Sequence, residues 1–312
     1  MARCLITGCE GFVGSHMADM LVAMGHDVYG STYAGTHNID HLKGKMVMMH
    51  CSLTEAASVQ RAVGKAKPDY VFHLAAQSYP TVSFKAPRLT LDANVVGTLN
   101  LLESIKRLAP KARVAVTSSS AVYGVRSVDE MPINENAGFR PTTPYAVSKV
   151  GQEMLSYMYH EVYRLDTIII RPFSMTGPRK TGDACSDFTK GIIEIEKERR
   201  RYLGVGRLDT IRDVTDGRDA VKAFWTIINK GKIGEVYNLC SNNRIPMSEI
   251  LQKAIASAGF KVKVKVLPSK MRVYDDPIYV GDNAKLRALG WKPTIPIEKT
   301  IRDDLEYWRN EL

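Results

Sequence analysis

Apolar and polar positions follow two alternating periods along the first half of the chain. Short apolar runs of strand length recur, and most are followed by about ten to twenty residues with apolar positions at helical spacing. Successive parallel strands need helical connections, so this alternation predicts a parallel sheet with helices on both faces. The predicted strands are 3–7, 28–30, 45–50, 69–74, 113–118 and 167–171, and the predicted helices are 17–25, 55–66, 90–107 and 144–164.

The alternation weakens after Pro172, where loops rich in glycine and proline replace it. Residues 219–229 then have the pattern of another helix and 235–240 that of another strand, so we expect the chain to return to the large sheet there. Beyond this strand we expect short helices and proline-containing loops. The sequence thus predicts an α/β fold, with a doubly wound parallel sheet and a smaller, mixed C-terminal lobe.

The composition narrows the class of protein. The chain has 312 residues, of which 45% are hydrophobic and 24% are charged. These proportions are typical of a globular protein and exclude a disordered, collagen-like or disulfide-scaffold chain. The longest apolar runs fall well short of the roughly 20 residues that cross a bilayer. The N-terminal run ends at Gly8, too early for a secretion signal, so we expect no membrane association.

Five cysteines are scattered along the chain without a Cys-x-x-Cys pair. An odd, scattered set is typical of reduced thiols in a cytoplasmic protein, and it does not favour disulfides or a metal site. We therefore expect a cytoplasmic protein without a bound metal. The cysteines are Cys4, Cys9, Cys51, Cys185 and Cys240.

The 43 Lys and Arg residues exceed the 33 Asp and Glu residues, which gives a formal charge of +10. Much of the excess lies in 197–201, which we interpret as the solvated face of a helix, and in 261–265, where Lys alternates with Val as on a half-buried strand. The alternative is a positive field that attracts an anionic small molecule or a nucleic acid. No nucleic-acid-binding motif accompanies these segments, so we expect no nucleic-acid partner.

Three glycines, Gly8, Gly11 and Gly14, lie between the first predicted strand and the first predicted helix. Glycines in this context allow a tight turn, a close approach to a pyrophosphate and close packing of helix on strand. The helix N-terminus adds unpaired N–H groups and the positive end of the helix dipole. The triplet therefore predicts that the first strand–loop–helix unit binds a dinucleotide.

Several motifs in order along the chain resemble those of the extended short-chain dehydrogenase/reductase superfamily, in its NAD-dependent epimerase/dehydratase branch. They are the glycine triplet, His73-Leu74-Ala75-Ala76, Asn94 in Asn94-Val95-Val96-Gly97-Thr98, Ser118-Ser119-Ser120, Tyr145-x-x-x-Lys149, Arg171-Pro172-Phe173, Gly177-Pro178, Arg212-Asp213-Val214-x-Asp216-x-x-Asp219 and Gly290-Trp291-x-Pro293. The resemblance implies an enzyme of sugar-nucleotide metabolism. It implies a Rossmann-type dinucleotide-binding domain over 1–171, with a return near 215–241, and a sugar-nucleotide-binding lobe over most of 172–312.

The resemblance also implies NAD or NADP as the coenzyme. The residues expected to bind it are Gly8, Gly11, Phe12, Val13, Gly14, Thr32, Leu74, Ala75, Ala76, Asn94, Tyr145 and Lys149. NAD-specific enzymes place an acid at the end of the second strand, where it binds the ribose 2′-hydroxyl. Thr32 stands there, and Tyr33 follows where NADP-preferring relatives carry Arg or Lys. The sequence therefore leaves the form of the coenzyme open.

Tyr145 and Lys149 are one helical turn apart, so their side chains share a face of the predicted helix. An ammonium beside a phenol favours the phenolate, so we expect a lowered pKa for Tyr145 and a role in proton transfer at a sugar hydroxyl. By resemblance, Lys149 also holds the nicotinamide ribose. Counting back from Tyr123-Gly124, the resemblance assigns the third catalytic hydroxyl to Ser119, with Ser118 and Ser120 as neighbours in case of a shift by one residue.

Ala121 narrows the set of reactions that the chain is expected to catalyse. Related 4,6-dehydratases carry Glu at this position, where its carboxyl group serves the elimination, and alanine cannot do this work. Hydride transfer at sugar C4 remains, either as reduction of a 4-keto sugar or as 4-epimerisation. The C-terminal half is most similar to the GDP-mannose 4,6-dehydratase and GDP-4-keto-6-deoxymannose reductase group, whereas residues 119–124 are more similar to 4-epimerases. We favour the reductase, and a non-catalytic NAD(P)-binding module is a further alternative.

Position and residue type suggest the groups that contact the substrate. They are Gln77, Ser78, Ser120, Ser174, Arg212 and Arg272. The two arginines are candidates for the diphosphate because a guanidinium group offers forked, permanently charged donors. The resemblance further implies a homodimer or homotetramer, paired through the helices predicted at 90–107 and 144–164.

Overall fold

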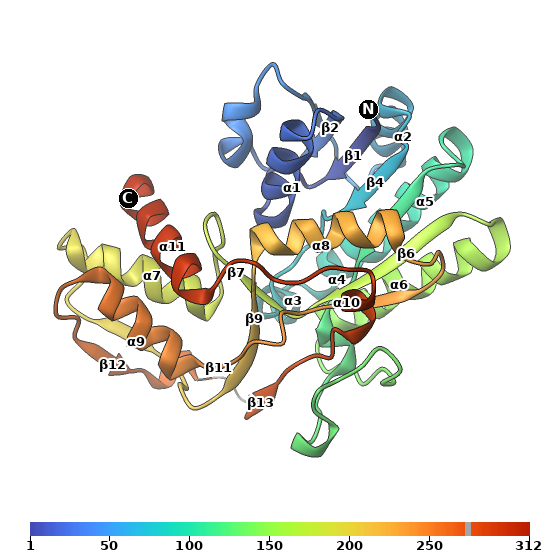
Figure 1. The fold of residues 1–312 in the computed structure, drawn as a ribbon. Helices are drawn as coiled ribbons and strands as arrows, with labels where there is room; N and C mark the ends of the chain where they lie inside the picture. Colours follow the sequence, from blue (N-terminus) through green and yellow to red (C-terminus); the bar gives the residue numbers. More distant parts are fainter. Residues whose placement is uncertain (272–275) are drawn as a thin grey trace.

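A seven-stranded parallel sheet forms the larger part of the molecule (Figure 1). The computed structural model describes residues 1–271 and 276–312. The six neighbouring pairs in the sheet are all parallel, and the strand order reverses direction between β1 and β4. The predicted doubly wound fold class is therefore confirmed, as is the return of the chain to the sheet. The order is β10 (Val236–Leu239), β6 (Asp166–Pro172), β5 (Arg113–Thr117), β4 (Tyr70–His73), β1 (Arg3–Thr7), β2 (Asp27–Thr32) and β3 (Val47–His50).

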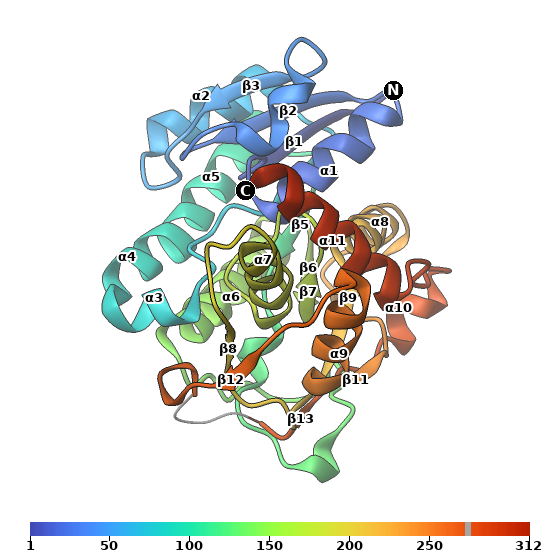
Figure 2. The ribbon, with the colours of Figure 1, turned by 90° about the vertical axis from the view of Figure 1, so that its left-hand side faces the viewer.

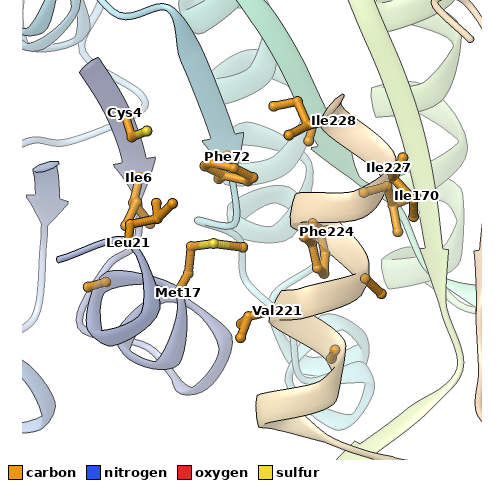
Figure 3. Close-up of a cluster of buried hydrophobic side chains, with 14 of the residues drawn as sticks. Cys4, Ile6, Met17, Leu21, Phe72, Ile170, Val221, Phe224, Ile227 and Ile228 are labelled. Carbon is orange, nitrogen blue, oxygen red and sulfur yellow. The ribbon is translucent and has the colours of Figure 1, made fainter. Parts of the chain in front are cut away.

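Helices cover both faces of this sheet because its strands bury side chains alternately on either side. Ile6 of β1 packs in one core with Met17 and Phe224, whereas the neighbouring Leu5 belongs to a second core on the opposite face. Figure 3 shows the first of these cores, where side chains from β1, β4 and β6 meet two helices. The first face carries α1 (Phe12–Ala23) and α8 (Gly217–Lys230), and the second carries α2 (Ala56–Ala66), α5 (Gly97–Leu108) and α6 (Pro144–Tyr163).

The C-terminal part of the chain builds a smaller lobe with its own core. Three helices, α7 (Ala184–Glu196), α9 (Met247–Ala258) and α11 (Ile297–Glu311), lie together beside the large sheet in both views (Figures 1 and 2). Their shared core includes Ile192, Val214, Ile250, Leu305 and Trp308. A mixed sheet joins β7 (Ser174–Thr176), β9 (Ile211–Asp216), β11 (Arg244–Pro246) and β13 (Ile278–Tyr279), and a second pair joins β8 (Leu203–Val205) and β12 (Val264–Val266).

Two sequence predictions for this lobe are wrong. α9 and α11 have 12 and 15 residues and are not short. The pattern missed α11 because it is mostly charged, and its buried positions, from Ile297 to Trp308, form a stripe that includes Thr300 and Asp304. Residues 197–201 follow the end of α7 and do not belong to its solvated face. In contrast, the lysines of 261–265 are exposed beside β12, as the alternation predicted.

Short elements connect the longer ones. The helix predicted at 90–107 is divided, because a π-helical turn, η2 (Asp92–Val96), precedes α5. The remaining short helices are α3 (Pro80–Lys85), α4 (Pro87–Leu91) and α10 (Ala284–Ala288), with the 3-10 turns η1 (His37–Leu42), η3 (Ser120–Tyr123), η4 (Val128–Glu130) and η5 (Pro268–Lys270). Over the described part of the chain, the search for a helix long and apolar enough to span a bilayer finds none.

Asp219 joins two of the sequence motifs. Its buried carboxylate accepts hydrogen bonds from the Thr294 N–H at 2.6 Å and the Ile295 N–H at 2.7 Å, and the Trp291 indole donates to its backbone oxygen at 3.1 Å. Burial opposes the ionisation of Asp219, but these bonds outweigh it and lower its pKa. The segment around Trp291 is thereby held against the start of α8.

Phe224 tests the packing between α8 and the sheet. Its side chain is fully buried, so Phe224→Ala removes a large apolar group from a closed core. We expect the free energy of unfolding to fall by about 3–5 kcal/mol, measured by denaturant titration. The matched control is Val266→Ala on β12, where the side chain is 56% exposed, and its change should stay within about 0.5 kcal/mol. Equal losses in the two variants would contradict the packing described.

Candidate active site

The candidate site lies at the carboxyl edge of the large sheet, where the strand order reverses between β1 and β4. Connections from neighbouring strands leave this point in opposite directions, which opens a crevice in sheets of this kind. The glycine loop follows β1, and the segment Leu74–Ala76 follows β4. Most of the predicted coenzyme-binding residues are therefore brought together by the fold.

The glycine loop is packed too closely for any side chain at two of its positions. Gly8 has φ +67°, and a Cβ atom there would lie 2.8 Å from the Cα of Ala75. A Cβ atom on Gly14 would lie 2.1 Å from the backbone oxygen of Gly8. Thr7 draws the strand ends together, because its hydroxyl accepts hydrogen bonds from the N–H groups of Leu74 and Ala75 at 3.2 Å. The glycines are thus required by the loop's own packing.

The start of α1 fits a pyrophosphate. Gly11 is the N-cap, and no side chain among the described residues caps the helix there. Phe12, Val13 and Gly14 form the first turn, in which N–H groups have no partner within a helix. Such groups, with the positive end of the helix dipole, are the donors that bind phosphate oxygens. The residues present therefore fit a dinucleotide.

A buried polar layer supports the segment that follows β4. The Asn94 amide accepts a hydrogen bond from the Gln77 N–H at 2.8 Å and donates to the Ser148 hydroxyl at 2.8 Å. Asn94 is fully buried within the π-helical turn η2, a rare element that is frequent at functional sites. Its amide is engaged within the protein, so the geometry gives Asn94 a positioning role and not a direct contact with the coenzyme.

The sequence analysis assigned no role to His73, the last residue of β4. Its ring bonds to the hydroxyls of Thr7 at 2.8 Å and Thr98 at 2.9 Å. Burial, together with the charge of Lys149, lowers the pKa of His73 to about 3. The ring is therefore neutral, and it links β1, β4 and α5 beneath the site.

Ser119, Tyr145 and Lys149 converge at the end of β5. Tyr145 lies in the first turn of α6 and is 9% exposed, whereas Lys149 is 3% exposed. The Lys149 ammonium donates to the backbone oxygen of Thr117 at 2.8 Å and lies 5.7 Å from the centre of the Tyr145 ring. The Ser119 side chain lies close enough to Tyr145 to act on the pKa of its phenol, which it lowers. In contrast, the Ser118 hydroxyl is buried against Glu153, so the geometry favours Ser119 over Ser118.

The predicted direction of the Tyr145 pKa is wrong. Burial raises the pKa of this phenol, and only the hydrogen bond with Ser119 acts to lower it. Lys149 is not among the groups that shift the pKa of Tyr145, and burial lowers the pKa of Lys149 itself to about 7, partly offset by Glu153. Tyr145 is therefore a protonated phenol at neutral pH, with a proton to donate.

A buried ion pair that the sequence did not predict anchors α6. Glu153 and Arg171 form a buried ion pair with an N–O distance of 2.6 Å, between α6 and β6. Arg171 also donates to the Tyr123 hydroxyl at 2.9 Å. Arg171 was part of a recognised motif, but its buried partner on another element could not be identified from spacing.

Ala121 lies in η3 between Ser119 and Tyr123, where its N–H donates to the Ser119 hydroxyl oxygen at 3.1 Å.

The predicted substrate residues are more dispersed. The Gln77 amide is engaged within the protein, since it donates to the Tyr79 backbone oxygen at 3.1 Å and to the Thr90 hydroxyl at 2.9 Å, and Ser78 beside it is exposed. The Ser120 backbone oxygen accepts from the Tyr279 hydroxyl at 2.7 Å. Ser174 is exposed on β7. Arg272 lies outside the described residues.

Arg212, on β9, uses part of its guanidinium in hydrogen bonds within the protein. Its guanidinium donates to the backbone oxygens of Ile211 and Asp276, both at 2.8 Å.

At the end of β2, Thr32 is buried, and the carboxylate beside this strand end comes from Glu10 of the glycine loop. The sequence analysis did not identify Glu10, because an acid in the loop gives no signal in a pattern read along β2.

Comparison with known sequences identifies relatives that match nearly the whole chain. The family model described as GDP-mannose 4,6 dehydratase matches residues 5–304. The chain is similar to the GDP-6-deoxy-D-mannose reductase of Pseudomonas aeruginosa, with 30% identity over 99% of this chain and 98% of that protein. It is also similar to the GDP-mannose 4,6-dehydratase of Vibrio cholerae serotype O1, with 32% identity over 96% of this chain and 91% of that protein.

Solved structures show the same fold. RMD from Pseudomonas aeruginosa, in complex with NADPH, is 28% identical, covers 100% of both chains and gives a TM-score of 0.86. The UDP-glucose 4-epimerase of Thermus thermophilus, in complex with NAD, is 26% identical, covers 99% of this chain and 100% of that chain, and gives a TM-score of 0.88. With the family model matched from β1 to α11, this chain belongs to the GDP-mannose 4,6-dehydratase family, among the sugar-nucleotide enzymes of the extended short-chain dehydrogenase/reductase type.

Proposed function

We propose that this chain is an NAD(P)H-dependent reductase of a 4-keto-6-deoxy sugar nucleotide, with a GDP-sugar as the favoured substrate. The observation that carries the proposal is the Ser119, Tyr145 and Lys149 cluster, with Ala121 in the same turn as Ser119. The three polar groups suffice for reduction of a ketone. Elimination needs a further carboxyl group, which alanine does not supply.

Reduction requires that hydride reach the ketone carbon and a proton reach its oxygen. The bound coenzyme supplies the hydride and is oxidised. Tyr145 donates its phenolic proton to the oxygen as the C=O bond becomes C–OH, since a phenol carries that proton at neutral pH. Ser119 lies beside the phenol, where its hydroxyl is available to bond the same ketone oxygen. Lys149, buried and one turn away, is available to hold the coenzyme ribose.

Neither the coverage nor the identity of the relatives decides the activity. This chain covers 98% of the Pseudomonas aeruginosa reductase but 91% of the Vibrio cholerae dehydratase and 87% of a Caenorhabditis elegans GDP-mannose 4,6 dehydratase. Sequence identity does not separate the two activities, since it is 30% for the reductase and 32% for one dehydratase. Ala121, which lacks the carboxyl group that elimination needs, therefore carries the preference over a dehydratase.

A 4-epimerase is the second candidate. Residues 119–124 are similar to those of 4-epimerases, and the same cluster can serve that reaction if the phenolate first accepts a proton from a sugar alcohol. In that reaction Tyr145 has to start as the phenolate, whereas reduction starts from the phenol.

Direct assay separates the candidates. With GDP-4-keto-6-deoxymannose and reduced coenzyme, we expect one coenzyme to be oxidised for each sugar reduced. The loss of absorbance of the reduced nicotinamide measures this oxidation. We expect GDP-mannose to be left unconverted. Interconversion of 4-epimers without net coenzyme use would favour the epimerase, and formation of a 4-keto product from GDP-mannose would refute the argument from Ala121.

Tyr145→Phe tests the role of the phenol. The variant keeps the ring but has no proton to donate, so we expect turnover to fall by about 10²- to 10⁴-fold. Coenzyme affinity, measured by fluorescence titration, should change little. Phe84→Ala, an exposed aromatic on α3, serves as the control and should retain turnover. Full activity in Tyr145→Phe would contradict the mechanism, whereas a loss of coenzyme binding would point to a structural role.

We further propose that two copies pair through α5 and α6 in a reducing, cytoplasmic setting. Leu99, Met154 and Tyr157 expose 37%, 46% and 52% of their surface on these two helices, which is typical of a face that another chain covers. All five cysteines are free and buried, which fits a reducing compartment.

Met154→Asp tests this pairing. A charge placed in an apolar interface is costly, so the mass in solution should fall to that of a smaller species, ideally the monomer, in light scattering. Val266→Asp, at an exposed position on β12, is the control and should keep the mass of the unaltered protein. An unchanged mass in Met154→Asp would exclude this face as the interface.

A further inference from the structure

Glu10 places a carboxylate at the end of β2, although β2 itself ends in Thr32. One carboxylate oxygen, Oε1, accepts hydrogen bonds from the Tyr33 N–H at 2.7 Å and the Ala34 N–H at 3.3 Å. The backbone oxygen of Glu10 accepts from the Asn38 amide at 2.9 Å. Glu10 is therefore fixed to the loop after β2 by three hydrogen bonds, in the glycine loop that precedes α1.

These contacts use the donors that a phosphate would need. In a Rossmann-type domain the adenosine ribose lies beside the end of the second strand, and its 2′ substituent faces this region. The backbone N–H groups of Tyr33 and Ala34 could bind an anion there, but the Glu10 carboxylate already occupies them. A 2′-phosphate would have to displace this carboxylate or lie against it, and like charges at short range repel.

The second carboxylate oxygen of Glu10 points to a hydroxyl group. Oε2 is buried and has no hydrogen-bond partner among the described residues. A buried carboxylate oxygen without a donor is costly, so a donor from a ligand would stabilise it. A ribose 2′-hydroxyl can donate such a bond, whereas a 2′-phosphate offers only acceptors at neutral pH.

The segment at the end of β2 supplies no cation that would offset the negative charge of Glu10. Residues 30–36 contain neither Lys nor Arg. Tyr33 stacks on His50 with ring centres 6.0 Å apart, and His37 bonds to Glu311 at 2.7 Å. The residues directly after β2 therefore bring no permanent positive charge, and the carboxylate beside them comes from Glu10.

We infer that Glu10 is a specificity-determining residue that makes this chain prefer NAD(H) over NADP(H). It takes the place of the acid that NAD-specific enzymes carry on the second strand itself, so the loop supplies what β2 lacks. This inference rests on the proposed use of a nicotinamide coenzyme. The solved relatives hold NADPH in one case and NAD in another, so the shared fold does not decide the coenzyme.

The test is to measure by fluorescence titration how tightly the full chain binds NADH and NADPH in the absence of a sugar substrate. We expect the unaltered protein to bind NADH at least about tenfold more tightly than NADPH. In Glu10→Gln the amide oxygen can still accept from Tyr33 and Ala34, but the charge is lost. The preference should therefore shrink toward equal affinity, mainly because NADPH binds more tightly.

The control is Asp129→Asn, which removes an exposed carboxylate on η4 and should leave the ratio of affinities unchanged. Equal affinities in the unaltered protein, or tighter binding of NADPH, would overturn the inference even if Glu10→Gln were unstable. An unchanged ratio in a folded Glu10→Gln would also overturn it. Failure to bind either coenzyme would instead refute the proposed function, so the two failures are distinguishable.

Discussion

The position of α6 against the sheet is the constraint on which the site depends. The buried pair of Glu153 and Arg171 joins α6 to β6, and the Lys149 ammonium joins the same helix to β5 through the Thr117 oxygen. Breaking a buried pair by removing one partner leaves an uncompensated charge, so these contacts hold the helix in one register. Tyr145 lies at the N-terminal end of this anchored segment, and its placement beside Ser119 follows from that register.

The sequence patterns predicted the large sheet because its elements are periodic and follow one another closely. The glycine triplet and the Tyr145 and Lys149 pair were found because their spacing along one element carries the signal. Three features could not be read in this way. The buried ion pair of Arg171 joins distant elements, the pKa of Tyr145 depends on burial that no spacing encodes, and α11 packs through a stripe that includes polar residues.

Two positions explain why family membership alone does not define the activity. The fold and the glycine loop are those of a family that includes dehydratases and is close to reductases and epimerases. Ala121 removes a group that elimination requires, while Glu10 adds a charge where the coenzyme's ribose would lie. Both are single side chains on a fold that the relatives share. The proposed reaction and the inferred coenzyme are thus arguments about local chemistry.

The central claim is that hydride passes to sugar C4 beside the Tyr145 phenol. Its most direct test is reduction of GDP-4-keto-6-deoxymannose with coenzyme carrying deuterium at the transferable nicotinamide position, followed by NMR of the product. The account predicts deuterium at C4 in proportion to the coenzyme consumed, in one configuration only. A product without deuterium at C4, or with deuterium at another carbon, would contradict it.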